Sequence, residues 1–109
     1  MIVKKYFGDT NSELTNIMSQ ACQGINIPEV DVMFSDDPQN PNSVRIMAFQ
    51  AIPEKQGYGT KAMNQICSIA DRNRINLLVT FTKPSISYFY SKFGFTNNHS
   101  LEMKRSYLP

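Results

Sequence analysis

The fold is decided by residues 43–63, SVRIMAFQAIPEKQGYGTKAM, and by the residues that follow them. Residues 43–52 alternate and are apolar on both predicted faces: Val44, Ile46 and Ala48 on one, Met47 and Phe49 on the other. A strand that is apolar on both faces belongs inside a sheet. After a loop at residues 53–59, the pattern predicts a helix from Thr60 to about Asn73 and a second strand at 77–81. Strand, helix and strand form a β-α-β unit, whose two strands should be parallel.

The loop of this unit, Gln56-Gly57-Tyr58-Gly59-Thr60, has the composition of an anion site. Two glycines let the backbone approach a ligand closely, and the amides at a helix N-terminus point toward a negative charge. The alternative is a glycine pair that makes a tight turn and binds nothing. Two other phosphate motifs do not fit, because the loop lacks the Gly-Lys-Ser/Thr ending of nucleoside-triphosphate loops and the third glycine of dinucleotide folds.

The segment before residue 43 predicts an edge strand, a helix and a second strand. Residues 2–7 suit a short strand at a sheet edge, and residues 30–34 alternate like a half-buried strand. Between them, a helix should begin at a Thr10–Glu13 capping box and end at a left-handed Gly24. Its expected apolar stripe is Leu14, Ile17, Met18, Ala21 and Cys22.

The segment after residue 83 predicts one more helix and the closing strands. A helical stripe at Ile86, Phe89, Tyr90 and Phe93 ends at Gly94, and Phe95 and residues 101–107 suit strands. We therefore expect residues 1–109 to form one α+β (α/β-like) domain, with a mixed central sheet flanked by helices.

Composition and charge narrow the classes of function. A hydrophobic fraction of 41% with 18% charged residues is that of a folded protein rather than a disordered one. The net charge of +2 comes from scattered residues without the basic face of a nucleic-acid binder, and no apolar stretch approaches the roughly 20 residues of a membrane span. We expect a cytoplasmic protein, a monomer or a homodimer, that binds neither nucleic acid nor membrane.

The cysteines and the single histidine give little sign of metal or thiol chemistry. Cys22 and Cys67 fall on predicted apolar helix faces, so we expect buried thiols rather than a disulfide or a nucleophile. With His99 as the one histidine and no Cys-x-x-Cys spacing, we expect no metal site.

A second motif, Phe89-Tyr90-Ser91-Lys92-Phe93-Gly94-Phe95, supports a ligand-binding interpretation of the glycine loop. With it, residues 43–107 resemble the Gcn5-related N-acetyltransferases (GNATs). In that family a β-bulged strand, a Gln/Arg-x-x-Gly-x-Gly/Ala loop and helix, a second strand and a Phe-Tyr-x-x-x-Gly-Phe helix end occur in this order. A narrower likeness, to short acetyltransferases encoded by bacteriophages, rests on the small size and the closing strand around Met103-Lys104-Arg105.

The resemblance implies acetyl-coenzyme A (acetyl-CoA) as cosubstrate and gives roles to residues. The amides of Gln56, Gly57, Tyr58, Gly59 and Thr60 would cradle the diphosphate, and the main chain of Phe49, Gln50 and Ala51 would hold the pantetheine arm. Tyr90 would protonate the departing thiolate, a role that suits a phenol with a pKa near 10. Without the motif, Tyr90 would be a core aromatic on the stripe of its helix. Lys55, Lys61 and Lys83 are candidate phosphate partners or solvated surface lysines.

The acceptor and the general base remain open in the sequence. We expect a lysine or amine on a larger partner to enter between residues 35–43 and the terminal strands near His99, with Asp36 and Asp37 attracting its charge. The candidate bases are His99, Glu54, Asp36, Asp37 and Glu102. The alternatives to an enzyme are a catalytically silent GNAT-fold binding protein and a phage effector that acts on a host protein.

Overall fold

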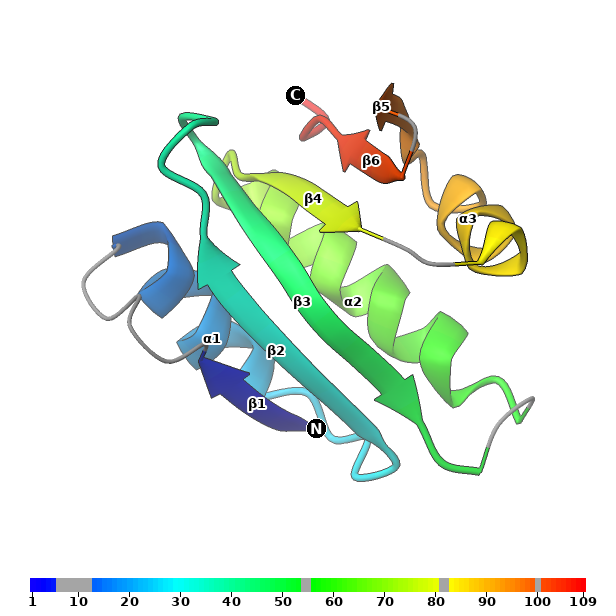
Figure 1. Ribbon diagram of the computed structural model, residues 1–109. Coiled ribbons are helices and arrows are strands. Elements are labelled where there is room, and N and C mark those ends of the chain that lie inside the picture. The colour runs from blue at the N-terminus through cyan, green and yellow to red at the C-terminus, as the bar shows by residue number, and fades with distance from the viewer. Residues whose placement is uncertain (6–12, 54–55, 81–82, 100) are drawn as a thin grey trace.

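Six strands form one mixed sheet in the order β1-β2-β3-β4-β6-β5 (Figure 1). The structure is a computed structural model that describes residues 1–5, 13–53, 56–80, 83–99 and 101–109. Strand β2 runs antiparallel to β3, and β3 runs parallel to β4, as the β-α-β pattern predicts. The elements in chain order are β1 Ile2–Lys5, α1 Glu13–Gln23, β2 Val30–Asp36, β3 Ser43–Ala51, α2 Tyr58–Arg72, β4 Asn76–Thr80, α3 Pro84–Ser91, β5 Thr96–His99 and β6 Glu102–Arg105.

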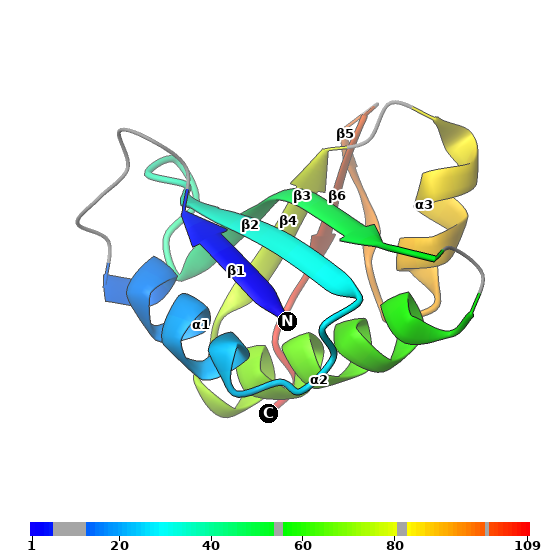
Figure 2. The same cartoon turned by 90° about the horizontal axis from the view of Figure 1, so that it is seen from below.

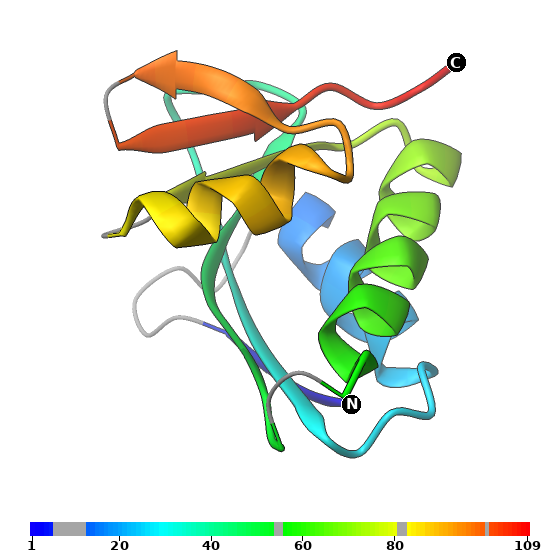
Figure 3. The ribbon, with the colours of Figure 1, turned by 90° about the vertical axis from the view of Figure 1, so that its right-hand side faces the viewer.

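Helices α1 and α2 cover the same face of the sheet (Figures 2 and 3). The apolar core lies between them and that face, and α3 adds Tyr90 to it. Its most completely buried large side chains include Met18, Phe34, Ile46, Met63, Ile66, Ile75 and Leu77. Strand β1 lies at one edge of the sheet, parallel to β2, as expected for an edge strand. In the described part of the chain, no helix is long and apolar enough to cross a membrane.

The side-chain alternation of strand β3 shifts at a β-bulge. Met33 pairs with Ala48 and Phe34 with Ile46, so Met47 is an extra residue on β3. The extra residue shifts the alternation by one. Phe49 and Ala51 therefore pack against the core, as Ile46 does, whereas Ala48 is exposed. The predicted sharing of one face by Ile46 and Ala48 is wrong for this reason.

Helix α1 forms where predicted, but two details of the prediction are wrong. Its buried residues are Thr15, Met18, Ser19 and Cys22, while Ala21 is exposed, so the helix is rotated toward its small polar side chains. Gly24 does not have the positive φ expected of it. The chain instead leaves the helix through short-range turns, in which the amides of Gly24 and Ile25 donate to the carbonyls of Ala21 and Cys22. Thr10, the predicted cap, lies outside the described residues.

The C-terminal strand fixes the end of α3. The guanidinium of Arg105, on β6, donates to both carboxylate oxygens of Asp71, on α2, at 2.8 and 3.0 Å. Its Nε donates to the carbonyl of Phe93 at 2.7 Å, directly before Gly94, which turns the chain with φ 91° as predicted. One nearly buried arginine thus joins α2, β6 and the end of α3.

Candidate functional site

The site lies where β3 and β4 separate. Among the described residues, the two parallel strands pair from Ser43 with Asn76 to Ile46 with Val79, while β3 continues to Ala51 and pairs there with β2 but not with β4. Beyond Ile46, the β3 backbone therefore turns one row of amides and carbonyls toward the gap between the strands. This unpaired row is available to a ligand.

A cavity of about 580 Å³ lies beside this unpaired half of β3. Its walls come from three elements that are distant in sequence: the end of β3, the start of α2 and the length of α3. An aromatic contact joins two of these walls, since the rings of Phe49 and Phe89 lie 6.0 Å apart and nearly parallel. The lining residues are Phe49, Gln50, Ala51, Gly57, Gly59, Thr60, Ser85, Ile86, Phe89, Tyr90 and Lys92.

The α2 wall presents the start of a helix to the cavity. The helix begins at Tyr58, two residues before the predicted start, with Gly57 as its N-cap at φ 83°. The first helical hydrogen bond runs from the Lys61 amide to the Gly57 carbonyl at 3.0 Å. The amides of residues 58–60 precede that bond and have no carbonyl one turn before them in the helix. They carry the partial positive charge of the helix terminus, which suits an anion.

The two glycines of the loop are needed for different reasons. At Gly57 a Cβ would meet nothing within 4 Å, so the left-handed backbone, not space, requires glycine. At Gly59 a Cβ would lie 3.5 Å from Phe49 and 3.7 Å from Phe89, in ordinary contact with the cavity wall. A side chain at position 59 would therefore fit the fold but would take space from a ligand.

Tyr90 lies between this cavity and a second one. The second cavity, of about 170 Å³, is lined by Ile46, Met47, Ala48, Phe49, Val79, Thr80, Ile86 and Tyr90, and so lies in the strand gap itself. The two cavities share Phe49, Ile86 and Tyr90. The Tyr90 side chain is only 5% exposed, and no described residue forms a hydrogen bond with its hydroxyl. Burial raises the pKa of Tyr90 to about 12, so the phenol is protonated at neutral pH.

The comparisons with known proteins agree with this geometry at the level of fold. No protein-family model and no curated protein matches the sequence. Among solved structures, the chain is similar to Ard1 from Thermoplasma volcanium, with a TM-score of 0.54 and 21% identity. The chain has a GNAT-like fold. The similarity covers 72% of this chain and 62% of Ard1, so the match spans less than two thirds of that protein.

Within the GNAT-like fold, six of the eight predicted coenzyme-binding residues line the larger cavity: Phe49, Gln50, Ala51, Gly57, Gly59 and Thr60. The remaining two, Gln56 and Tyr58, contribute main chain to the loop; the Gln56 side chain is exposed, and the Tyr58 side chain packs against the core. The motif brings these residues to one cavity wall, and only the folded structure shows which of the loop side chains face the cavity.

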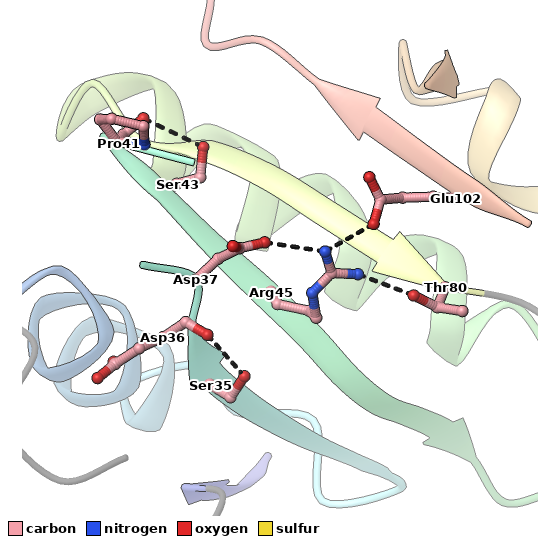
Figure 4. Close-up of polar contacts among 8 residues, drawn as sticks. All are labelled: Ser35, Asp36, Asp37, Pro41, Ser43, Arg45, Thr80 and Glu102. Atoms are coloured by element: carbon pink, nitrogen blue, oxygen red, sulfur yellow. Dashed lines mark hydrogen bonds and ion pairs between the residues drawn. The ribbon is translucent and has the colours of Figure 1, made fainter. Parts of the chain in front are cut away.

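The acidic residues that were expected to attract an acceptor are engaged inside the protein. Asp36 accepts a hydrogen bond from Thr15 of α1 at 2.5 Å. Asp37 and Glu102 both pair with Arg45, at 2.8 and 2.6 Å, and Arg45 also donates to Thr80 (Figure 4).

This cluster corrects the prediction that Asp36 and Asp37 present free charge at a rim. It also leaves Asp36, Asp37 and Glu102 poorly suited to act as a base. The other two candidates, Glu54 and the side chain of His99, lie outside the described residues.

The lysine that lines the larger cavity is not one of those singled out in the sequence. Lys61 and Lys83 are exposed and do not line either cavity, and Lys55 lies outside the described residues. Lys92 does line it, together with Ser85 and Phe89 on the same stripe of α3. The signal was present in the sequence, because positions 85, 89 and 92 share a helix face.

The two cysteines have no part in this site. Cys22 and Cys67 are buried and free, and burial raises their pKa values to about 12 and about 11. Both are thus protonated at neutral pH and unsuited to be nucleophiles. Among the described residues, no group of histidine, cysteine and carboxylate side chains could hold a metal ion.

Proposed function

We propose that the protein is an acetyl-CoA-dependent N-acetyltransferase that transfers the acetyl group directly to an amine. The observation that carries the proposal is the placement of Tyr90 between two cavities, one of which begins at the N-terminus of α2. The fold neighbour Ard1 is an acetyltransferase, which supports acetyl transfer in general.

The larger cavity fits the coenzyme chemically. The amides of residues 56–60 would hold its diphosphate at the positive end of α2, and none of the described lining residues is acidic. The pantetheine arm carries amide groups, which would pair with the main chain of Phe49, Gln50 and Ala51 where β3 has no partner in β4. The arm then leads the thioester toward Tyr90.

Tyr90 would act as the general acid of the transfer. The amine nitrogen attacks the thioester carbonyl, the C–N bond forms, the C–S bond breaks, and the departing thiolate takes the phenolic proton of Tyr90. The surplus proton of the amine passes to solvent, and the Tyr90 phenolate regains a proton from solvent. Burial raises the pKa of Tyr90 to about 12, which alone would make this transfer uphill. A thiolate formed in the same buried place is desolvated too, so its proton affinity rises with that of the phenolate.

The second cavity supports entry of the acceptor from the other side of the strand gap. It reaches Tyr90 and ends at Thr80, beside the Arg45 cluster. We propose that the acceptor is a lysine or amine carried on a larger partner, which would bring its own surface to this chain. The likeness to a solved structure does not point to a bacteriophage enzyme.

A charge introduced at Thr60 tests the coenzyme site. Thr60 is the third residue of α2 and lines the cavity, so Thr60→Glu favours the helix N-terminus while repelling a diphosphate. We expect calorimetry to show binding of acetyl-CoA to the wild type and to Thr60→Gln, but not to Thr60→Glu, while thermal unfolding shows Thr60→Glu at least as stable. Equal affinity in all three proteins would contradict the assignment.

A catalytically silent GNAT-fold binding protein is the second candidate, and one observation favours it. Three of the five candidate bases, Asp36, Asp37 and Glu102, are held by Thr15 or Arg45. Incubation with labelled acetyl-CoA and either a lysate proteome or a panel of polyamines, amino acids and aminoglycosides separates the two. Coenzyme binding without transfer to any acceptor would favour the silent protein.

A further inference from the structure

Lys92 is the one charged side chain among the described residues that line the larger cavity. It follows the last residue of α3, about 10 Å along the helix axis from Ser85 at the other end of the same wall. Its ammonium lies 5.7 Å from the ring centroid of Phe89, which itself lies against the position of Gly59. Lys92 is therefore at the end of the cavity that contains the α2 N-terminus.

An exposed aromatic ring accompanies this lysine. Tyr88 is 71% exposed, and the Lys92 ammonium lies 5.7 Å from its ring centroid as well. The lysine thus sits between an inner ring, Phe89, and an outer ring, Tyr88, and is favourably placed against both faces. An exposed ring placed beside a cation offers a flat surface on which a planar group of a ligand can stack where the ligand leaves the cavity.

We propose that Tyr88 and Lys92 form the subsite for the nucleotide end of the coenzyme, with Lys92 pairing with the ribose 3′-phosphate and Tyr88 stacking on the adenine. This inference rests on the proposed function, in which the α2 amides take the diphosphate. The ligand then has one further anionic group, a phosphate monoester with close to two negative charges, and Lys92 is the cation that the described cavity wall offers to it.

The test compares binding of coenzyme A and 3′-dephospho-coenzyme A by calorimetry. The pair would be partly exposed, so the wild type should bind coenzyme A about threefold to tenfold more tightly than the dephospho form. Lys92→Met, which keeps the apolar stem, should bring this ratio to about one, and Lys92→Arg should preserve it. Lys4→Met removes the same charge from exposed Lys4 on β1 and should leave the ratio unchanged.

Tyr88 is tested with a ligand that lacks the nucleotide. Loss of one aromatic stacking partner should weaken binding of coenzyme A about tenfold in Tyr88→Ala, and Tyr88→Phe should restore it. S-acetyl-4′-phosphopantetheine has no adenosine, so it should bind equally to the wild type and both variants.

The outcomes separate this inference from the function on which it rests. No binding of coenzyme A to the wild type would overturn both. Binding with no preference over the dephospho form, or a preference that survives in Lys92→Met, would overturn the subsite alone. Weaker binding of S-acetyl-4′-phosphopantetheine to Tyr88→Ala would likewise show that Tyr88 supports the cavity rather than the nucleotide.

Discussion

The two halves of β3 have the same secondary structure but opposite surroundings. Residues 43–46 pair on both sides and are largely buried, whereas residues 48–51 pair, within the described part of the chain, with β2 alone, and residues 47–51 line the two cavities. One extra residue, Met47, separates the halves. A single strand can thus supply both the rigid support of a site and the unpaired backbone of the site itself, provided that its second partner ends early.

The largest expected effect is on turnover, at Tyr90 of α3, which faces the half of β3 that does not pair with β4. If Tyr90 is the general acid proposed above, Tyr90→Phe should lower turnover on an identified acceptor by about 10² to 10⁴-fold, because proton transfer is lost, while acetyl-CoA affinity stays nearly unchanged. Steady-state kinetics with calorimetry checks this, and Tyr107→Phe, outside both cavities, serves as a control. Equal turnover in the wild type and Tyr90→Phe would make Tyr90 a packing residue.

One truncation directly before the bulge and one at the bulge residue compare the contributions of the two halves of β3 to stability. Ile46 is 2% exposed in the paired half, so Ile46→Ala should lower the free energy of unfolding by about 2 to 5 kcal/mol. Met47 is 43% exposed, and Met47→Ala should change it by no more than about 0.5 kcal/mol. Urea denaturation measures both, and similar losses would mean that the bulge does not divide the strand energetically.

Alanine substitutions at the two loop glycines should change the stability of the protein in opposite directions. Gly57→Ala puts a side chain on a backbone with φ 83° and should cost about 1 to 2 kcal/mol of stability. Gly59→Ala adds a helix former where a Cβ makes ordinary contacts, and should stabilise the fold by up to about 1 kcal/mol while weakening acetyl-CoA binding. Thermal unfolding and calorimetry on both variants decide this. A destabilised Gly59→Ala would show that the wall has no room there.

The sequence predicted the order of the elements better than their local geometry. Apolar alternation predicted β3, a nearly continuous apolar run predicted β4, and the order of the two motifs indicated the GNAT-like sheet, because all of these are local patterns. The bulge was not located, since Met47 is an ordinary strand residue and only its pairing with β2 makes it extra. The engagement of Asp37 and Glu102 by Arg45 likewise depends on contacts between residues far apart in the chain.

The candidate site shows the same contrast between features that local sequence patterns indicate and features that depend on contacts between distant residues. The loop and Tyr90 belong to motifs that are visible in the sequence. Lys92 stands at a variable position of the second motif, and because surface lysines are common, only the folded wall shows that it lines the cavity. The contacts of Asp36 with Thr15 and of Asp37 with Arg45 could not be predicted, because a turn rich in acids is ordinarily solvated and both partners are distant in sequence.

The smallest expected effect is on the pH dependence of stability, through the ion pair of Arg105 with Asp71 that supports the end of α3. Hydrogen bonds from Arg105 hold the pKa of Asp71 below its ordinary value. The stability that this pair contributes is therefore present above the unfolded-state pKa and is lost as pH falls through the lower folded-state value. The free energy of unfolding should decrease between about pH 5 and pH 2 and do so less steeply in Asp71→Asn. Identical slopes in urea titrations would contradict this.

The bulge makes one position of β3 dispensable for the strand's register. The side chain of Met47 is half in solvent, so most residues should be accepted there. Deleting Met47 would place Ala48 directly after Ile46, and these two residues already pair with the consecutive residues Met33 and Phe34 of β2. The ladder would become regular, and Phe49 and Ala51 would stay on the face that packs against the core. A scan of single-residue deletions along β3 should therefore find Met47 the best tolerated position.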